Sequence, residues 1–139
     1  MGIHTSLETL MKGERRDPVM EIEQAVANRA LILRLSGELD LKTAPSFKET
    51  VLQALGAARL HDLVVNLSAV TFVDSSGIGV LLGSYKELQR GGGQVVLVAP
   101  QPHVRTVLEL AGLARLMPFV TTEAEALELV AAGRRQANA

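Results

Sequence analysis

Two kinds of hydrophobic periodicity follow one another along this chain. Apolar and polar residues alternate over residues 21–26, and apolar residues again occupy every second position over 30–36. Such alternation is typical of half-buried β-strands. Only a few residues around Asn28 separate the two segments. So short a connection predicts an antiparallel hairpin.

After the hairpin, helical and strand-like patterns take turns. Near-continuous apolar runs at 63–67 and 95–98 predict central strands that are covered on both faces. A short strand around Phe119 follows Pro118, which suits an edge position because proline cannot donate to the ladder. Apolar residues recur at helical spacing in four segments, which lie at about 44–55, 76–90, 104–111 and 122–130. The order is ββαβαβαβα, which predicts an α/β fold with a mixed, mostly parallel sheet.

Local signals mark the ends of these helices. Thr43 is a predicted N-cap for the first of them. Thr122 and Glu125 predict a capping box for the last one. The three glycines at 91–93 end the helix over 76–90, because glycine accepts the left-handed conformation that follows a helix.

Only the two ends of the chain fall outside this pattern. Residues 1–19 combine mixed charge with little sustained periodicity, and they predict a loose arm or a leader upstream of the domain. Residues 132–139 predict a flexible tail. The 139 residues therefore contain a single predicted domain at 20–131, a size that one hydrophobic core can support.

Composition narrows the classes of function. The net charge of -1 provides no basic field for nucleic-acid phosphates, and Tyr85 and three phenylalanines are the only aromatic residues available for stacking on bases. With no cysteine, disulfides and thiolate metal sites are excluded. No apolar run approaches the roughly 18 residues of a membrane span. We therefore expect a cytoplasmic protein that binds neither nucleic acid nor membrane.

Residues 70–79 (VTFVDSSGIG) form the most unusual segment. They place one carboxylate and two hydroxyls where a central strand gives way to a helix. Backbone N–H groups are unpaired at such a junction, so a phosphate on Ser75 or Ser76 is predicted to find donors there. Gly77 and Gly79 are expected to leave room for an approaching partner. The alternative is that Ser75 or Ser76 is merely the N-cap of the helix.

The serine and glycine positions of the chain match none of three kinds of enzyme site. A serine hydrolase elbow reads G-x-S-x-G, but Val73 stands where its first glycine is required. A dinucleotide site reads G-x-G-x-x-G, but Gly77, Gly79 and Gly83 are spaced differently. The triple glycine ends a helix, whereas a phosphate loop begins one. We therefore expect no catalytic site, no bound cofactor and no metal.

A second polar cluster, residues 36–40, leaves the second strand. Its carboxylates, Glu38 and Asp40, follow Gly37, but their spacing matches no metal-ligand set. The alternative is a polar loop in which Asp40 accepts hydrogen bonds from the local backbone.

The two clusters together resemble the STAS family, the domain shared by sulfate transporters and anti-sigma factor antagonists. The likeness covers about residues 20–130 and is greatest to the sporulation type, which partners a sigma-F anti-sigma factor. The motifs that carry it lie at 35–40 (LSGELD), 65–67 (VNL), 72–83 (FVDSSGIGVLLG), 85–86 (YK) and 110–113 (LAGL).

The resemblance implies a binding switch without enzyme activity. In this family the unphosphorylated antagonist binds an anti-sigma factor that is an ATP-dependent serine kinase, and thereby releases the sigma factor. The kinase then phosphorylates the serine that is Ser75 here, and a metal-dependent serine phosphatase reverses the reaction. ATP belongs to the partner. The residues that the resemblance places in the partner-binding surface are Gly37, Glu38, Asp40, Asp74, Ser76, Gly77 and Ile78.

Two features depart from the sporulation type. Residues 1–19 have no counterpart in it, and Ser84 stands where it usually carries a basic residue. The sigma factor pathway therefore stays open. The alternative function is a STAS scaffold subunit of a larger signalling or lipid-transport complex. A scaffold subunit predicts stable large oligomers, whereas a free antagonist predicts a monomer or weak dimer.

Overall fold

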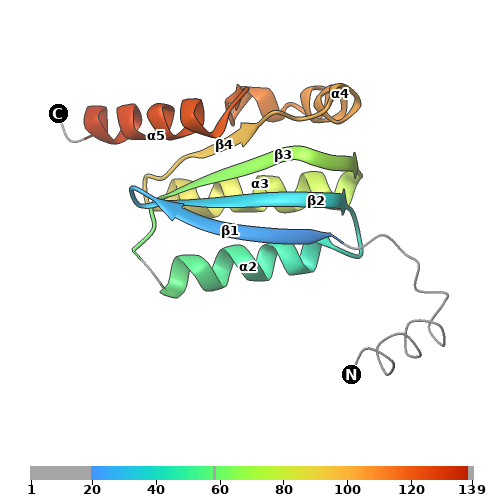
Figure 1. Cartoon of the computed structure of the whole chain (residues 1–139), viewed down its shortest axis with the longest axis horizontal. Helices are drawn as coiled ribbons and strands as arrows, with labels where there is room; N and C mark the ends of the chain where they lie inside the picture. Colours follow the sequence, from blue (N-terminus) through green and yellow to red (C-terminus); the bar gives the residue numbers. More distant parts are fainter. Residues whose placement is uncertain (1–19, 58, 138–139) are drawn as a thin grey trace.

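The computed structural model describes residues 20–57 and 59–137, and these form one sheet with helices on both faces (Figure 1). The strands are β1 (Glu21–Ala27), β2 (Ala30–Leu39), β3 (Asp62–Val73), β4 (Val95–Val98) and β5 (Phe119–Val120). The helices are α2 (Ala44–Ala57), α3 (Ser75–Arg90), α4 (Pro102–Leu110) and α5 (Glu123–Ala137), with a short 3-10 helix, η2 (Leu113–Arg115), before β5. The predicted order of strands and α-helices is confirmed.

The strands lie in the sheet in the order in which they follow along the chain. β1 pairs with β2 antiparallel, and the pairs β2–β3, β3–β4 and β4–β5 are parallel. Asn28 and Arg29 turn the hairpin with positive φ angles of 50° and 68°. Two residues with positive φ match the right-handed twist of the strands they join. The predicted mixed sheet with an opening hairpin is confirmed.

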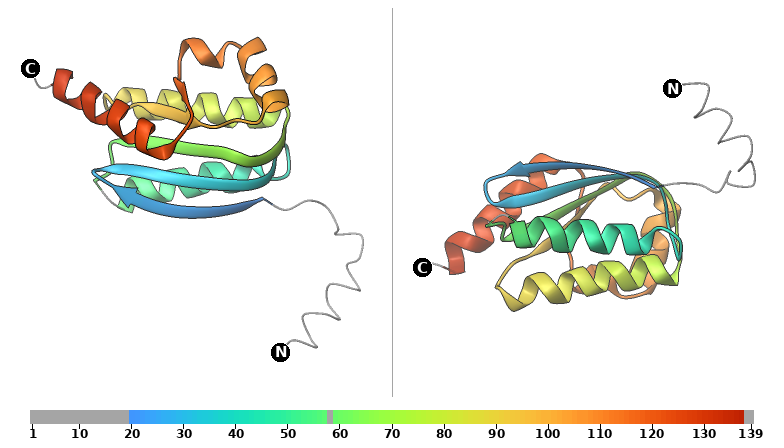
Figure 2. Two further views of the ribbon diagram at one scale, coloured as in Figure 1. Left: turned by 45° about the horizontal axis from the view of Figure 1, so that its top comes forward. Right: turned by 90° about the horizontal axis from the view of Figure 1, so that it is seen from below.

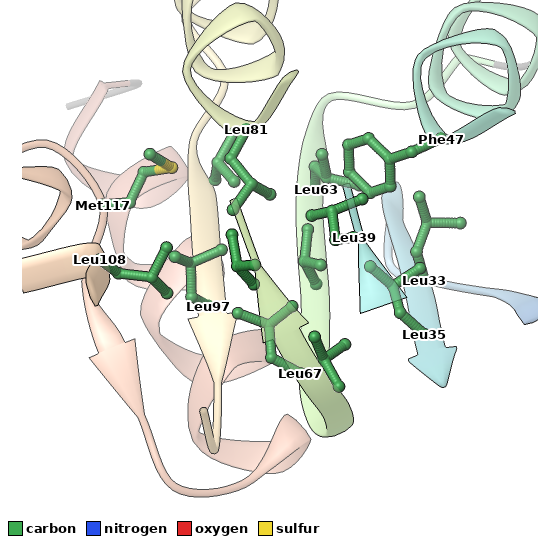
Figure 3. Packing of buried hydrophobic residues seen from close by; sticks show 14 of the residues in the cluster. Leu33, Leu35, Leu39, Phe47, Leu63, Leu67, Leu81, Leu97, Leu108 and Met117 are labelled. Carbon is green, nitrogen blue, oxygen red and sulfur yellow. The ribbon is translucent and has the colours of Figure 1, made fainter. Parts of the chain in front are cut away.

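Apolar side chains fill the space on both faces of the sheet. α2 and α3 lie side by side on one face, and α5 crosses the other (Figure 2). On the first face Phe47 of α2 and Leu81 of α3 point toward the strand leucines (Figure 3). The face beneath α5 carries alanine and β-branched residues, which pack against that helix: Ala30, Ile32, Val64, Val96 and Val98.

Two strands are longer than the apolar patterns indicate. β2 continues to Leu39 and β3 to Val73, and these two residues are paired. The register shifts between Arg34 and Ser36 and again before Glu38. Such irregularities interrupt the alternation of side chains between the two faces. The period of two therefore disappears from the sequence although the strands continue.

The last helix is also longer than predicted. α5 continues through Ala137, beyond the end expected near Val130. The prediction of a flexible tail over 132–139 is therefore wrong for residues 132–137. The predicted arm over residues 1–19 lies outside the described residues. No helix of the described ranges is both long and apolar enough to cross a bilayer.

A buried carboxylate explains why α5 continues. Asp62, at the start of β3, is fully buried, and its Oδ1 accepts a hydrogen bond of 2.9 Å from the Gln94 backbone N–H. His61 Nδ1 lies 3.3 Å from the same oxygen, and Arg134 Nη1 of α5 lies 3.6 Å from Oδ2. Arg134 also donates to the Asn28 carbonyl in the hairpin turn. These contacts attach the end of α5 to the start of β3 and to the hairpin turn.

The opposite end of α5 is fixed by a polar network. Arg34 donates to both carboxylate oxygens of Glu123, Nε to Oε2 at 2.8 Å and Nη2 to Oε1 at 2.9 Å. Asn66 Nδ2 donates to Glu123 Oε2 at 2.8 Å. The hydrogen bond from Arg34 lowers the pKa of the Glu123 carboxyl. The capping box is confirmed, since the Thr122 N–H donates to Glu125 Oε1 at 3.0 Å and the Glu125 N–H to Thr122 Oγ1 at 3.1 Å.

This network predicts a measurable dependence of stability on pH. The pKa of Glu123 is lower in the folded than in the unfolded chain. Its ionised form therefore stabilises the fold fully above the unfolded pKa of about 4.3, and this contribution is lost as the pH falls through the folded value. In urea titrations the free energy of unfolding of the wild type should fall more steeply below about pH 5 than that of Glu123→Gln. Parallel curves for the two proteins would contradict the assignment.

Candidate functional site

The carboxyl ends of β2 and β3 bring the two polar clusters of the sequence together. Because Leu39 pairs with Val73, the loop after β2 and the start of α3 lie next to each other. The Asp74 backbone N–H donates to the Leu39 carbonyl at 3.3 Å. The Leu41 backbone N–H donates to Asp74 Oδ2, also at 3.3 Å. Parallel pairing thus joins segments that are 33 residues apart in the sequence.

Asp74 is the N-cap of α3. Its Oδ1 accepts hydrogen bonds from the Ser76 N–H at 2.8 Å and the Gly77 N–H at 3.0 Å. The alternative prediction that Ser75 or Ser76 is the N-cap is therefore wrong. The expectation that unpaired N–H groups await a phosphate is wrong for these two donors, because the carboxylate already uses them.

Ser75 is the first residue of α3, and its side chain is exposed. No described residue makes a hydrogen bond to its hydroxyl. Ser76, the next residue, is half-buried. Large apolar side chains are exposed at the same end of the strands, with Leu41 at 73% and Phe72 at 46% of their full accessibility. Exposed large apolar side chains next to polar groups are typical of a surface that binds another protein.

The loop between β2 and α2 is built around Asp40. Its Oδ1 accepts from the Lys42 N–H at 3.0 Å and the Thr43 N–H at 3.1 Å, which confirms the reading of a locally bonded polar loop. The Thr43 hydroxyl donates to the Glu38 carbonyl at 2.7 Å and accepts from the Asp40 N–H at 2.9 Å. The helix begins at Ala44 as expected, but the Thr43 hydroxyl organises the loop instead of capping the helix.

The glycines of the site have different roles. Gly37 has a φ of 109° at the irregular part of β2, a conformation that favours glycine. A Cβ on Gly77 would lie 2.3 Å from the Leu39 carbonyl oxygen, so the space expected for a partner is filled by the chain's own backbone. A Cβ on Gly79 would meet no atom within 4 Å. Ile78 is half-buried and packs against the core.

A groove that no sequence pattern predicted begins beside Ser76 and runs between α2 and α3. Its volume is about 600 Å³. Ser84 lies in it, buried, with its hydroxyl donating to the Val80 carbonyl at 3.0 Å. The lining is mostly apolar or small and consists of Leu41, Ala44, Pro45, Lys48, Val51, Leu52, Ser76, Gly79, Val80, Gly83, Ser84 and Glu87. Its signal in the sequence is the pair of glycines four residues apart on one side of α3.

The chain matches the model of a known protein family. The family model described as STAS domain matches residues 20–126, which include every element of the site. The chain belongs to the STAS domain family. The resemblance drawn from the two sequence motifs is confirmed.

Relatives of this STAS domain include proteins named as antagonists of anti-sigma factors. It is 35% identical over 108 residues to an anti-sigma F factor antagonist of Paenibacillus polymyxa, covering 78% of this chain and 92% of the relative. An anti-sigma-B factor antagonist of Staphylococcus aureus is 29% identical over 98 residues, which are 70% of this chain and 90% of the relative.

Solved structures agree with this family. Unphosphorylated SpoIIAA, an anti-sigma factor antagonist, superposes with a TM-score of 0.72 at 30% identity, covering 81% of this chain and 97% of that one. The phosphorylated form of Bacillus SpoIIAA gives a TM-score of 0.64 at 30% identity, covering 79% and 99%.

The two neighbouring glycines of this STAS domain provide a matched pair of variants. Gly77→Ala should lower the free energy of unfolding by about 1–3 kcal/mol, because its methyl group overlaps the Leu39 carbonyl oxygen. Gly79→Ala should raise it by about 0.5–1 kcal/mol, because alanine is the better helix former and the added atom meets open space. Urea unfolding measures both values, and equal effects would contradict the close approach at Gly77.

A second pair of variants tests the cap. Asp74→Ala should lower the free energy of unfolding by about 0.5–2 kcal/mol, because the Ser76 and Gly77 N–H groups lose their acceptor. Asp74→Asn should lose less stability than Asp74→Ala, since its amide oxygen can still accept from Ser76 and Gly77, although its amide nitrogen leaves the Leu41 N–H without an acceptor. Equal losses in the two variants, measured by urea unfolding, would show that charge and not capping is the main contribution.

Proposed function

We propose that this STAS domain is an anti-sigma factor antagonist that is switched off by phosphorylation of Ser75. Unphosphorylated, it binds an anti-sigma factor that is a serine kinase, and the sigma factor is released. The observation that carries the proposal is the Ser75 side chain, which is exposed at a helix start with exposed apolar residues nearby. The names of the relatives support this class of partner. The domain acts in the cytoplasm as a monomer or weak dimer.

The switch is electrostatic. A phosphate adds about 1.5 to 2 negative charges at one point of the surface. Asp74 already uses the Ser76 and Gly77 N–H groups, so the phosphate gains no ready donors there and stands beside a carboxylate. Its charge therefore faces the partner and has to be desolvated on binding. A thousandfold loss of affinity corresponds to about 4 kcal/mol, a reasonable effect for a doubly charged group in an interface.

The proposed division of labour leaves the chemistry to other proteins. The kinase partner binds ATP and transfers its phosphoryl group to the Ser75 hydroxyl. A metal-dependent serine phosphatase restores the unmodified form. This domain needs no cofactor of its own in the cycle, because its part is to bind, to present one hydroxyl and to carry the charge.

The proposed contact surface consists of the accessible side chains that lie near Ser75. Glu38, Asp40, Ser76 and Ile78 are partly accessible near Ser75 and are proposed to contact the partner. The structure adds two exposed apolar side chains to this surface, Leu41 and Phe72. The remaining predicted residues act by shaping it: Gly37, Asp74 and Gly77.

The test is a phosphorylation and binding assay with serine-kinase anti-sigma factors from the same genome. One kinase should place a single phosphate on Ser75, located by mass spectrometry, and the phosphate should be absent in Ser75→Ala but present in Ser76→Ala. The phosphorylated protein should bind this kinase at least about 100-fold more weakly, with an unchanged circular dichroism spectrum.

Other results would contradict the proposal. Phosphate on Ser76 would move the switch by one residue. Firm binding to an anti-sigma factor without phosphorylation, together with stable large oligomers, would favour the scaffold subunit.

A further inference from the structure

The groove between α2 and α3 begins beside Ser76 and extends along the two helices away from the proposed switch. Figure 2 shows the two helices running alongside each other on one face of the sheet. Each wall is one stripe of a helix, because the lining residues of α2 and of α3 recur at intervals of three and four. From Ser76, next to Ser75, to Glu87 the α3 wall is about 16 Å long at 1.5 Å per residue.

The floor of the groove lacks side chains where a partner would approach. A Cβ on Gly79 or Gly83 would meet no atom within 4 Å. Leu41 and Leu52, on the α2 side, are 73% and 46% exposed. Gly79 and Gly83 leave one exposed stripe of α3 without side chains. The resulting open apolar channel can admit side chains from outside.

The geometry favours a helical occupant. The backbone groups of α2 and α3 are bonded within each helix, so an extended peptide finds no strand edge with which to pair. A third helix can instead place its apolar side chains between the two stripes, as packed helices do at distances of about 8–10 Å between axes. The two glycines allow its side chains to come close to the α3 backbone.

The charges in the groove specify one further property of the occupant. Glu87, at the far end, lies 3.4 Å from Arg90 and is thus partly neutralised. Lys48 on the α2 wall forms no ion pair with any residue that the structure describes. The unbalanced charge in the groove is therefore positive, and it is complementary to a carboxylate of the occupant.

We infer that this groove docks an amphipathic helix of the anti-sigma factor, with apolar side chains over Gly79 and Gly83 and an acidic residue against Lys48. The inference rests on the proposed function and extends its interface along α3. Since Ser76 belongs to both surfaces, a phosphate on Ser75 stands at the mouth of the groove.

The inference is tested by substitutions that fill the groove with side chains. In the double variant Gly79→Leu/Gly83→Leu the new side chains occupy open space, so the fold is retained. The variant should bind the kinase identified by the Ser75 assay at least about tenfold more weakly, as expected when central apolar contacts are blocked. The matched control is Gly56→Leu, a glycine of α2 whose Cβ would also meet nothing within 4 Å and which lies outside the groove lining. It should bind within about twofold of the wild type.

A charge variant and a kinetic readout complete the experiment. Lys48→Glu should also weaken binding about tenfold, as reversal of a charge that faces an opposite charge does. With phosphorylation of Ser75 as the readout, the KM for these variants should rise while kcat stays unchanged, because the hydroxyl and its surroundings are intact. Residues 44–52 and 79–87 should gain protection from hydrogen exchange in the complex.

Three results would overturn the inference, and they are distinguishable. If no kinase binds the wild-type protein, the proposed function and the groove fall together. If the wild type binds and is phosphorylated on Ser75 but the double variant binds equally well, only the groove inference falls. If the double variant loses self-association in sedimentation experiments and keeps its affinity for the kinase, the groove belongs to a second copy of this chain.

Discussion

The parallel pairing of β2 with β3 extends to Leu39 and Val73, and the candidate site depends on that extension. Without it, the loop after β2 and the start of α3 would be separate surface segments. Their contact is tight, because the Gly77 backbone approaches the Leu39 carbonyl where no Cβ fits. Asp74 completes the connection by accepting from Leu41 on one side and from the first turn of α3 on the other. One carboxylate thus sets the position of Ser75.

In this construction the residues that hold the site together differ from those that are proposed to contact a partner. The residues that hold the site together are internal to it, namely the pairing of the strand ends, the cap and the close approach of Gly77. The residues that are proposed to meet a partner are exposed. Among the described residues none makes a hydrogen bond to the Ser75 hydroxyl, so a phosphate there breaks no such bond. A modification of this hydroxyl therefore changes the surface charge without a requirement to rearrange the core. The groove beside α3 is similar, because Gly79 and Gly83 leave open space on its surface and do not pack against other residues.

Local patterns determined a large part of the fold. The hairpin, the order of strands and helices and the capping box of α5 each depend on residues within one or two turns of the chain. The period of the apolar residues and short side-chain-to-backbone bonds are sufficient to predict them. The two motifs that indicated the family, around Asp40 and Ser75, were readable for the same reason. The cap by Asp74 is also local. An aspartate directly before a helix is a common N-cap, so the sequence already contained the signal for Asp74 in place of Ser75 or Ser76.

Tertiary structure decided what depends on residues far apart in the sequence. Arg34 and Glu123 are 89 positions apart, and only the packing of α5 on the sheet brings them into contact. Arg134 was predicted to lie in a tail, because the buried Asp62 carboxylate that it contacts lies in β3, far away in the sequence. The groove likewise needs two helices at a fixed separation, which no periodicity within either helix encodes. The sequence by itself determined the elements and the chemistry at their ends, and the long-range register of the sheet decided which of these ends meet.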